Sequence, residues 1–85
     1  MKVRLLFFAS LRERLGATGE ELEVPATVNT VGALREHLRG RGGAWAEVFA
    51  PNRNVRAAVN QDMVQPATPL KAGDEVAFFP PVTGG

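Results

Sequence analysis

The 85-residue sequence contains no cysteine and a single histidine, His37. A chain without cysteine cannot build a zinc ribbon, an iron–sulfur site or a disulfide scaffold, and it has no thiol that could act as a nucleophile or carry a persulfide. His37 has no carboxylate at a spacing typical of metal ligands. We therefore expect no metal site, and a solvated or half-buried histidine.

Charge of one sign and long hydrophobic runs are also scarce. Ten basic and nine acidic residues leave a net charge of +1, which is too little to attract nucleic acid or an acidic lipid surface. No apolar run approaches the roughly 20 residues that span a bilayer, and residues 1–4 show no signal-peptide pattern. We therefore expect no nucleic-acid partner, no membrane partner and a cytoplasmic location.

The short length limits what the chain can do alone. It has room for one domain, and a domain of this size buries only about 60–65% of the surface that its unfolded chain exposes. An enclosed active site is hard to build around so thin a core. We therefore expect a module that works through a larger partner.

Hydrophobic periodicity predicts both strands and helices. The expected strands cover residues 2–9, 20–24, 55–59, 63–65 and 75–79. Thr30 is a favourable N-cap for a helix over 31–39, whose apolar residues recur at i, i+3 and i+7. A shorter helix is expected over 44–50, and one helical turn over 11–15 with Ser10 as its cap.

This order of elements predicts an α+β roll. We expect a mixed sheet of about four to five strands, with one main helix and a second short helix packed on one face. If the connection is right-handed, the first and last strands lie side by side and parallel, which is the β-grasp arrangement of ubiquitin-like proteins. A ferredoxin-like fold is the alternative, but it needs two helices of similar size. The domain is expected to cover residues 1–80, followed by a flexible tail at 81–85.

The C-terminal segment is the most informative motif. It reads Pro80-Pro81-Val82-Thr83-Gly84-Gly85 and follows directly on the last predicted strand. Each proline fixes φ and removes a backbone donor, so the pair stops the strand from extending. The two glycines have the widest backbone freedom, so this end can thread a narrow channel and present a bare carboxylate to another protein. A frayed terminus is the alternative interpretation.

Strand parity predicts a second feature beside this tail. If the first and last strands are neighbours, Leu6 and Phe8 share an outer face with Ala77 and Phe79. Exposed aromatic residues on a sheet are typical of interfaces. We therefore expect these four residues to bind a partner; the alternative is that segment 11–15 folds over them.

Several stretches together resemble one known family. They are residues 6–9 (LFFA), 11–13 (LRE), 30–35 (TVGALR), 57–61 (AAVNQ) and 73–85 (GDEVAFFPPVTGG). In these stretches the sequence resembles the MoaD family, the ubiquitin-like sulfur carriers that form the small subunit of molybdopterin synthase. The resemblance covers essentially the whole chain, and its C-terminal block is the most specific part.

The resemblance implies that Gly85 is the reactive residue. An adenylating enzyme of the ubiquitin-activating type would use ATP to join the Gly85 carboxylate to AMP, and a sulfurtransferase donor would convert it to a thiocarboxylate. Pro81, Val82, Thr83 and Gly84 would thread the tail into the large synthase subunit, where the sulfur passes to a cyclic pyranopterin precursor. A heterotetramer of two large and two small subunits is implied. This chain would bind no cofactor and would not be catalytic alone.

Two alternatives share the fold and the tail. One is a sulfur carrier for thiamine thiazole, tRNA thiolation or cysteine synthesis. The other is a ubiquitin-like modifier that is conjugated to target lysines through Gly85.

Overall fold

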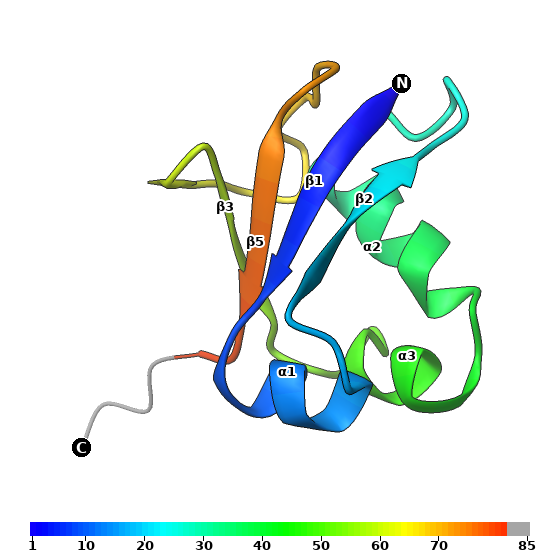
Figure 1. Ribbon diagram of the computed structural model, residues 1–85, viewed down its shortest axis with the longest axis vertical. Coiled ribbons are helices and arrows are strands. Elements are labelled where there is room, and N and C mark those ends of the chain that lie inside the picture. Colours follow the sequence, from blue (N-terminus) through cyan, green and yellow to red (C-terminus); the bar gives the residue numbers. More distant parts are fainter. Residues whose placement is uncertain (82–85) are drawn as a thin grey trace.

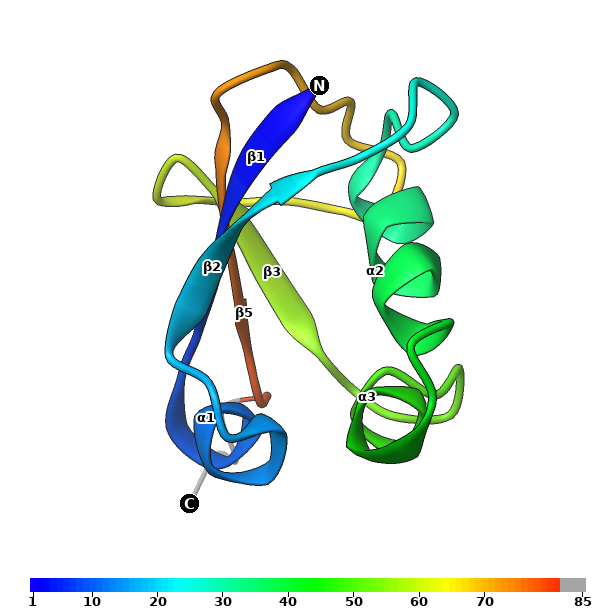
Figure 2. The same ribbon diagram turned by 45° about the vertical axis from the view of Figure 1, so that its right-hand side comes forward.

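The computed structural model describes residues 1–81, drawn as ribbons in Figures 1 and 2. In chain order the elements are β1 (Lys2–Phe7), α1 (Ala9–Leu15), β2 (Gly19–Glu23), α2 (Val31–Arg39), α3 (Gly43–Val48), β3 (Arg56–Val59), β4 (Asp62–Met63) and β5 (Glu75–Phe79). Within this part of the chain, no helix has the length and apolar character needed to cross a membrane.

The strands form one sheet in the order β2-β1-β5-β3-β4. β1 and β5 pair in parallel, whereas the other neighbours pair antiparallel. In Figure 1 the last strand runs beside the first in the middle of the sheet. Figure 2 shows α2 and α3 together on one side of it. The predicted mixed sheet and its β-grasp arrangement are therefore confirmed, with three helices in place of the two that the sequence predicts.

Helix α2 packs on the core with a capped N-terminus and a buried apolar stripe. The Thr30 Oγ1 accepts a hydrogen bond from the Ala33 N–H at 3.1 Å, which confirms the predicted N-cap and stabilises the helix by about 1 kcal/mol. Val31, Leu34 and Leu38 form the buried stripe of this helix. They pack in the same core cluster as the inward-facing residues of β1 and β5.

Aromatic rings fill the end of the core from which the tail departs. The ring of Phe78, near the end of β5, meets Phe49 edge-on with centroids 5.1 Å apart and stacks on Phe7 at 6.4 Å. Trp45 of α3 meets Phe7 edge-on at 5.4 Å. Such pairs add about 0.5–1.5 kcal/mol each beyond their area burial. These ring contacts therefore hold the end of β5, directly before the tail, against the core.

The corner after β1 differs from the sequence prediction. The predicted strand runs to residue 9, but β1 ends at Phe7 because Ala9, with φ of 54°, adopts a left-handed conformation that takes the chain out of the sheet. Residues 9–15 form the complete helix α1 instead of a single turn. Its N-cap is Phe8, which makes no side-chain capping bond. The predicted cap at Ser10 is therefore wrong, and Ser10 lies inside the helix.

The β3–β4 hairpin offers a stability test. Its two turn residues, Asn60 and Gln61, have φ of 50° and 73°, which is the geometry of a type I′ turn and favours glycine at the second position. We expect Gln61→Gly to raise the free energy of unfolding by about 0.5–1 kcal/mol in urea denaturation, because the left-handed strain is relieved. The matched control Gln65→Gly, outside the positive-φ pair, should lower it. Equal effects of the two variants would contradict this assignment.

Candidate functional site

An apolar row crosses four strands of the sheet on the side away from the helices. Leu6 of β1 pairs with Ala77 of β5, Ala77 pairs with Ala58 of β3, and Ala58 pairs with Met63 of β4. Directly paired residues project from the same face of a sheet. The row is therefore continuous, and it lies on the face opposite to the core.

Two aromatic residues extend this row toward the tail. Phe79 ends β5, and Phe8 follows β1 as the N-cap of α1. The Phe8 N–H still donates to the Phe78 carbonyl at 3.1 Å, so Phe8 stays next to Phe79 although it has left the strand. We call the combined surface the apolar face. Its members are Leu6, Phe8, Ala58, Met63, Ala77 and Phe79.

The exposure of these side chains separates the apolar face from the core. Phe8 is 46% exposed and Met63 is 54% exposed, and they are the large hydrophobic residues that stand most open to solvent in residues 1–81. Leu6, Ala77 and Phe79 are half-buried. The four residues predicted from parity therefore do lie together, and α1 leaves Phe8 open. Their role in binding a partner stays a prediction.

Sequence reasoning missed two members of this surface. Met63 was assigned only to a short strand, and Ala58 is buried without joining the core cluster. The signal was available, because a two-residue turn at Asn60-Gln61 fixes the pairing of Ala58 with Met63.

Charged residues border the apolar face at both of its ends. Arg4 of β1 pairs with Glu21 on one side and with Glu75 on the other, so opposite charges stand next to one another across three strands. Arg56 of β3 pairs with Phe79 at the tail end and is exposed. The face therefore has the apolar centre and polar rim that are typical of protein interfaces.

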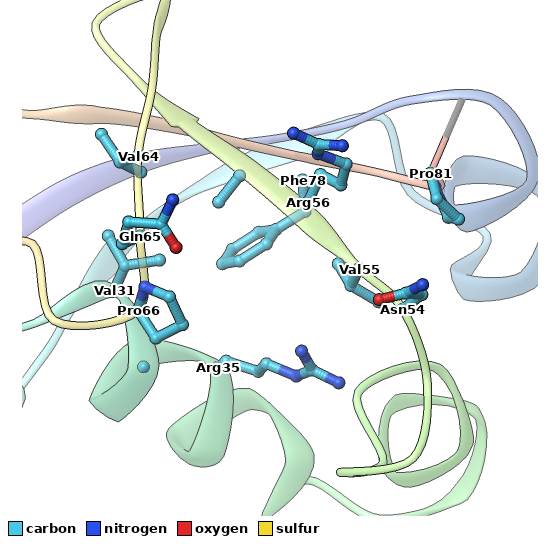
Figure 3. A pocket seen from close by; sticks show the side chains of 12 residues that line it. Val31, Arg35, Asn54, Val55, Arg56, Val64, Gln65, Pro66, Phe78 and Pro81 are labelled. Carbon is cyan, nitrogen blue, oxygen red and sulfur yellow. The ribbon is translucent and has the colours of Figure 1, made fainter. Parts of the chain in front are cut away.

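The tail leaves the sheet between two hollows. The first, of about 240 Å³, lies between α2 and β3, with Pro81 at one end and Arg35 and Arg56 in its lining (Figure 3). The second, of about 270 Å³, is lined by Pro80 and Pro81 together with Arg14 and Arg53. Both prolines are half-buried. The exit of the chain is thus held by the walls of the domain at a basic corner.

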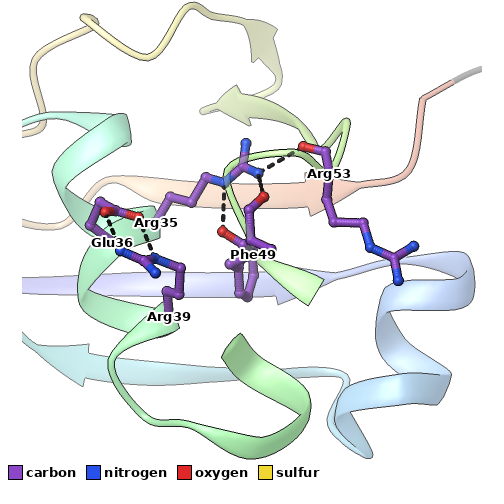
Figure 4. A network of polar contacts seen from close by, with 6 residues as sticks. Arg35, Glu36, Arg39, Phe49 and Arg53 are labelled. Atoms are coloured by element: carbon purple, nitrogen blue, oxygen red, sulfur yellow. Dashed lines mark hydrogen bonds and ion pairs between the residues drawn. The ribbon is translucent and has the colours of Figure 1, made fainter. Parts of the chain in front are cut away.

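Arg35 of α2 sets the position of one of these walls. Its guanidinium donates to the carbonyl oxygens of Phe49 at 3.3 Å, Ala50 at 2.6 Å and Arg53 at 2.7 Å (Figure 4). Burial lowers the pKa of Arg35 from its ordinary value, and the nearby Glu36 carboxylate opposes that shift. Sequence analysis assigned Arg35 no role of its own. The side chain instead ties down the segment that leads into β3 beside Pro81.

Other expected site residues are placed as follows. Pro81 is described and lies at the tail root, but Val82, Thr83, Gly84 and Gly85 lie outside the described residues. His37 is exposed on α2. Over residues 1–81, no three or more His, Cys, Asp or Glu side chains gather into a group that could hold a metal ion. The described part therefore brings the apolar face and the tail root at Pro81 together at one end of the sheet.

These features define a ubiquitin-like domain with an apolar face beside its C-terminal exit. The chain belongs to the ThiS family, whose model matches residues 5–85. It is 47% identical over 83 residues to the molybdopterin synthase sulfur carrier subunit of Escherichia coli K12, which covers 98% of this chain and 99% of that protein. The resemblance found in the sequence is thereby confirmed.

Two solved structures support the fold and bear on possible partners. SAMP1, a small archaeal modifier protein of Haloferax volcanii, matches with a TM-score of 0.78 and 28% identity over 100% of both chains. A protein–protein complex of subunits 1 and 2 of molybdopterin-converting factor from Helicobacter pylori contains a chain that matches with a TM-score of 0.68 and 26% identity, again over 100% of both chains.

Proposed function

We propose that this chain is the sulfur carrier subunit of a molybdopterin synthase, acting in molybdenum cofactor biosynthesis. The observation that carries the proposal is the junction of the apolar face with the tail root at Phe8 and Phe79. A partner that binds this face also receives the segment that leaves at Pro80. The 47% identity to the Escherichia coli carrier subunit supports this choice of pathway.

The chemistry centres on the Gly85 carboxylate. A carboxylate is a poor electrophile at neutral pH, so it first attacks the α-phosphate of ATP; pyrophosphate leaves, and a mixed anhydride with AMP forms. A donor then supplies sulfur at the sulfide level, which displaces AMP and leaves a thiocarboxylate. The thiocarboxylate sulfur bonds to the cyclic pyranopterin precursor, and water then cleaves the acyl–sulfur bond, so the sulfur stays on the precursor and the Gly85 carboxylate is restored. Two deliveries supply the dithiolene of molybdopterin. Acids and bases at the reacting carboxylate must come from the partners, because residues 80–85 contain no ionisable side chain.

The partner that fits the apolar face is the large synthase subunit. Aromatic residues are the usual anchors of such interfaces, and Phe8 and Phe79 lie where the apolar face meets the tail root. The Helicobacter pylori complex supports a large-subunit partner for a chain of this fold. An adenylating enzyme of the ubiquitin-activating type is the second partner, since it must hold the same tail before sulfur is delivered. A heterotetramer with two large subunits is the expected assembly.

The alternatives have weaker support. The archaeal modifier SAMP1 is 28% identical to this chain, compared with 47% for the molybdopterin synthase carrier. Sulfur carriers of different pathways share the same tail chemistry. The molecule that accepts the sulfur, and not the carrier, therefore distinguishes another sulfur pathway from the proposed one.

Intact-mass measurement of the chain purified from its host tests the proposal. We expect a fraction in which one oxygen is replaced by sulfur, and fragmentation should locate the exchange at Gly85. This fraction should disappear when the activating enzyme is deleted. A chain found only as the free carboxylate, or only in conjugates with lysines of other proteins, would contradict the proposal and, in the second case, favour the modifier role.

A further inference from the structure

All amines of the chain lie at one end of the domain. Ten residues are basic, but only Lys2 and Lys71 are lysines. Lys2 begins β1, and Lys71 belongs to the turn before β5, where the Gly73 N–H donates to the Lys2 carbonyl at 2.7 Å. The Met1 amino group is at the same end and pairs with the Glu23 carboxylate at 3.0 Å.

The tail leaves from the opposite end. β5 begins at Glu75, near these amines, and ends at Phe79, where the chain turns away from the sheet (Figure 1). From Asp74 to Pro80 the chain is extended, which separates the amine-bearing end from the tail root by about 20 Å at roughly 3.3 Å per residue. The five residues from Pro81 to Gly85 span at most about 17 Å at roughly 3.4 Å per residue.

The basic residues beside the tail root are arginines and not lysines. Those that line the two hollows at Pro80 and Pro81 are all arginines, namely Arg14, Arg35, Arg53 and Arg56. A guanidinium stays protonated at neutral pH and is not a nucleophile, whereas a lysine amine loses its proton more readily and attacks acyl groups. Positive charge is thus provided beside the tail without an amine.

We propose that this arrangement protects the activated tail from its own chain. The inference rests on the proposed function, in which Gly85 passes through an acyl adenylate. A lysine amine near that carbonyl would attack it; AMP would leave, an isopeptide bond would close the chain on itself, and one proton would be released. The cyclised chain could not carry sulfur. With the amines at the far end, Gly85 meets them only when the tail is almost fully extended back along the sheet, so their effective concentration at Gly85 is low.

A full chain that carries a Gly85 thioester, prepared by intein cleavage, tests this directly. Arg53→Lys and Arg56→Lys each place an amine at the tail end with no change of charge. Arg4→Lys is the matched control, because Arg4 pairs with Glu75 at the end of β5 that is far from Pro80, whereas Arg56 pairs with Phe79 beside it. After incubation at mildly alkaline pH, intact mass separates the hydrolysed chain from the cyclised chain, which is lighter by one water molecule. Peptide mapping then locates the isopeptide bond.

We expect the two tail-end variants to form at least about tenfold more cyclised chain than the wild type or Arg4→Lys, since only they raise the local amine concentration. Equal cyclisation in all four chains would overturn the inference, as would rapid cyclisation of the wild type at Lys2 or Lys71. The lysine pattern would then be a consequence of an arginine-rich composition. Because the thioester needs no activating enzyme, this result is independent of whether the host adenylates the chain, which the intact-mass measurement decides.

Discussion

Deletion of Gly85 is expected to abolish sulfur transfer, by more than about a thousandfold, while the melting temperature stays within error of the wild type. The residue lies beyond the part of the chain that forms the core, since β5 ends at Phe79. Its removal shortens the reach of the tail by about 3.4 Å. A displacement of even about 1 Å from the reactive geometry can reduce a rate a hundredfold. The chain should therefore fold normally and deliver nothing.

The complementary variant carries one extra alanine after Gly85. It too should be inactive, because the carboxylate is moved past the position that both partners recognise. One alanine placed before Met1 is the matched control and should retain transfer. The readouts are product formation with the large subunit, intact mass for the thiocarboxylate, and thermal unfolding. Transfer by either tail variant at a rate within tenfold of the wild type would contradict the mechanism in which Gly85 is the sulfur-bearing residue.

The parts of this structure that the sequence predicted well are those where local pattern and tertiary packing agree. The bounds of β5 were predicted correctly because Val76 and Phe78 alternate with outward residues between the Gly73 turn and the proline pair. The cap at Thr30 was predicted because threonine is a favoured N-cap residue and stands directly before the apolar stripe, where its side chain bonds the first turn of α2. Once β1 and β5 are taken as neighbours, the alternation of side chains along each strand predicts that Leu6, Phe8, Ala77 and Phe79 lie on the same outer face.

The predictions that failed depend on information that is not local. The residues around Ala9 give no signal for a left-handed φ. An alanine adopts this conformation only when the packing of the surrounding structure requires it. The role of Arg35 depends on carbonyl groups 14 to 18 residues away along the chain. Long-range hydrogen bonds of this kind leave no periodic signal. The position of the apolar face could therefore be predicted from the sequence. The hydrogen bonds by which Arg35 holds the segment beside Pro81 could not.

The apolar face can be tested with a substitution that favours folding and opposes binding. Phe8 is the N-cap of α1, has extended backbone angles, and makes no capping bond; aspartate is among the best residues at such a position. We expect Phe8→Asp to raise the free energy of unfolding by up to about 1 kcal/mol. It also places a charge in the proposed interface beside the tail root, so affinity for the large subunit should fall at least about a hundredfold. Calorimetric titration and urea denaturation measure the two effects.

Two further variants make this result specific. Phe8→Leu keeps the site apolar and should bind within a few-fold of the wild type, whereas Phe79→Ala removes the neighbouring anchor and should weaken binding about tenfold or more without unfolding the domain. Because Phe8→Asp is expected to stabilise the fold, its loss of affinity cannot be ascribed to misfolding. Normal affinity of Phe8→Asp and Phe79→Ala would show that the large subunit binds elsewhere, and the apolar face would then need a different partner to account for its exposure.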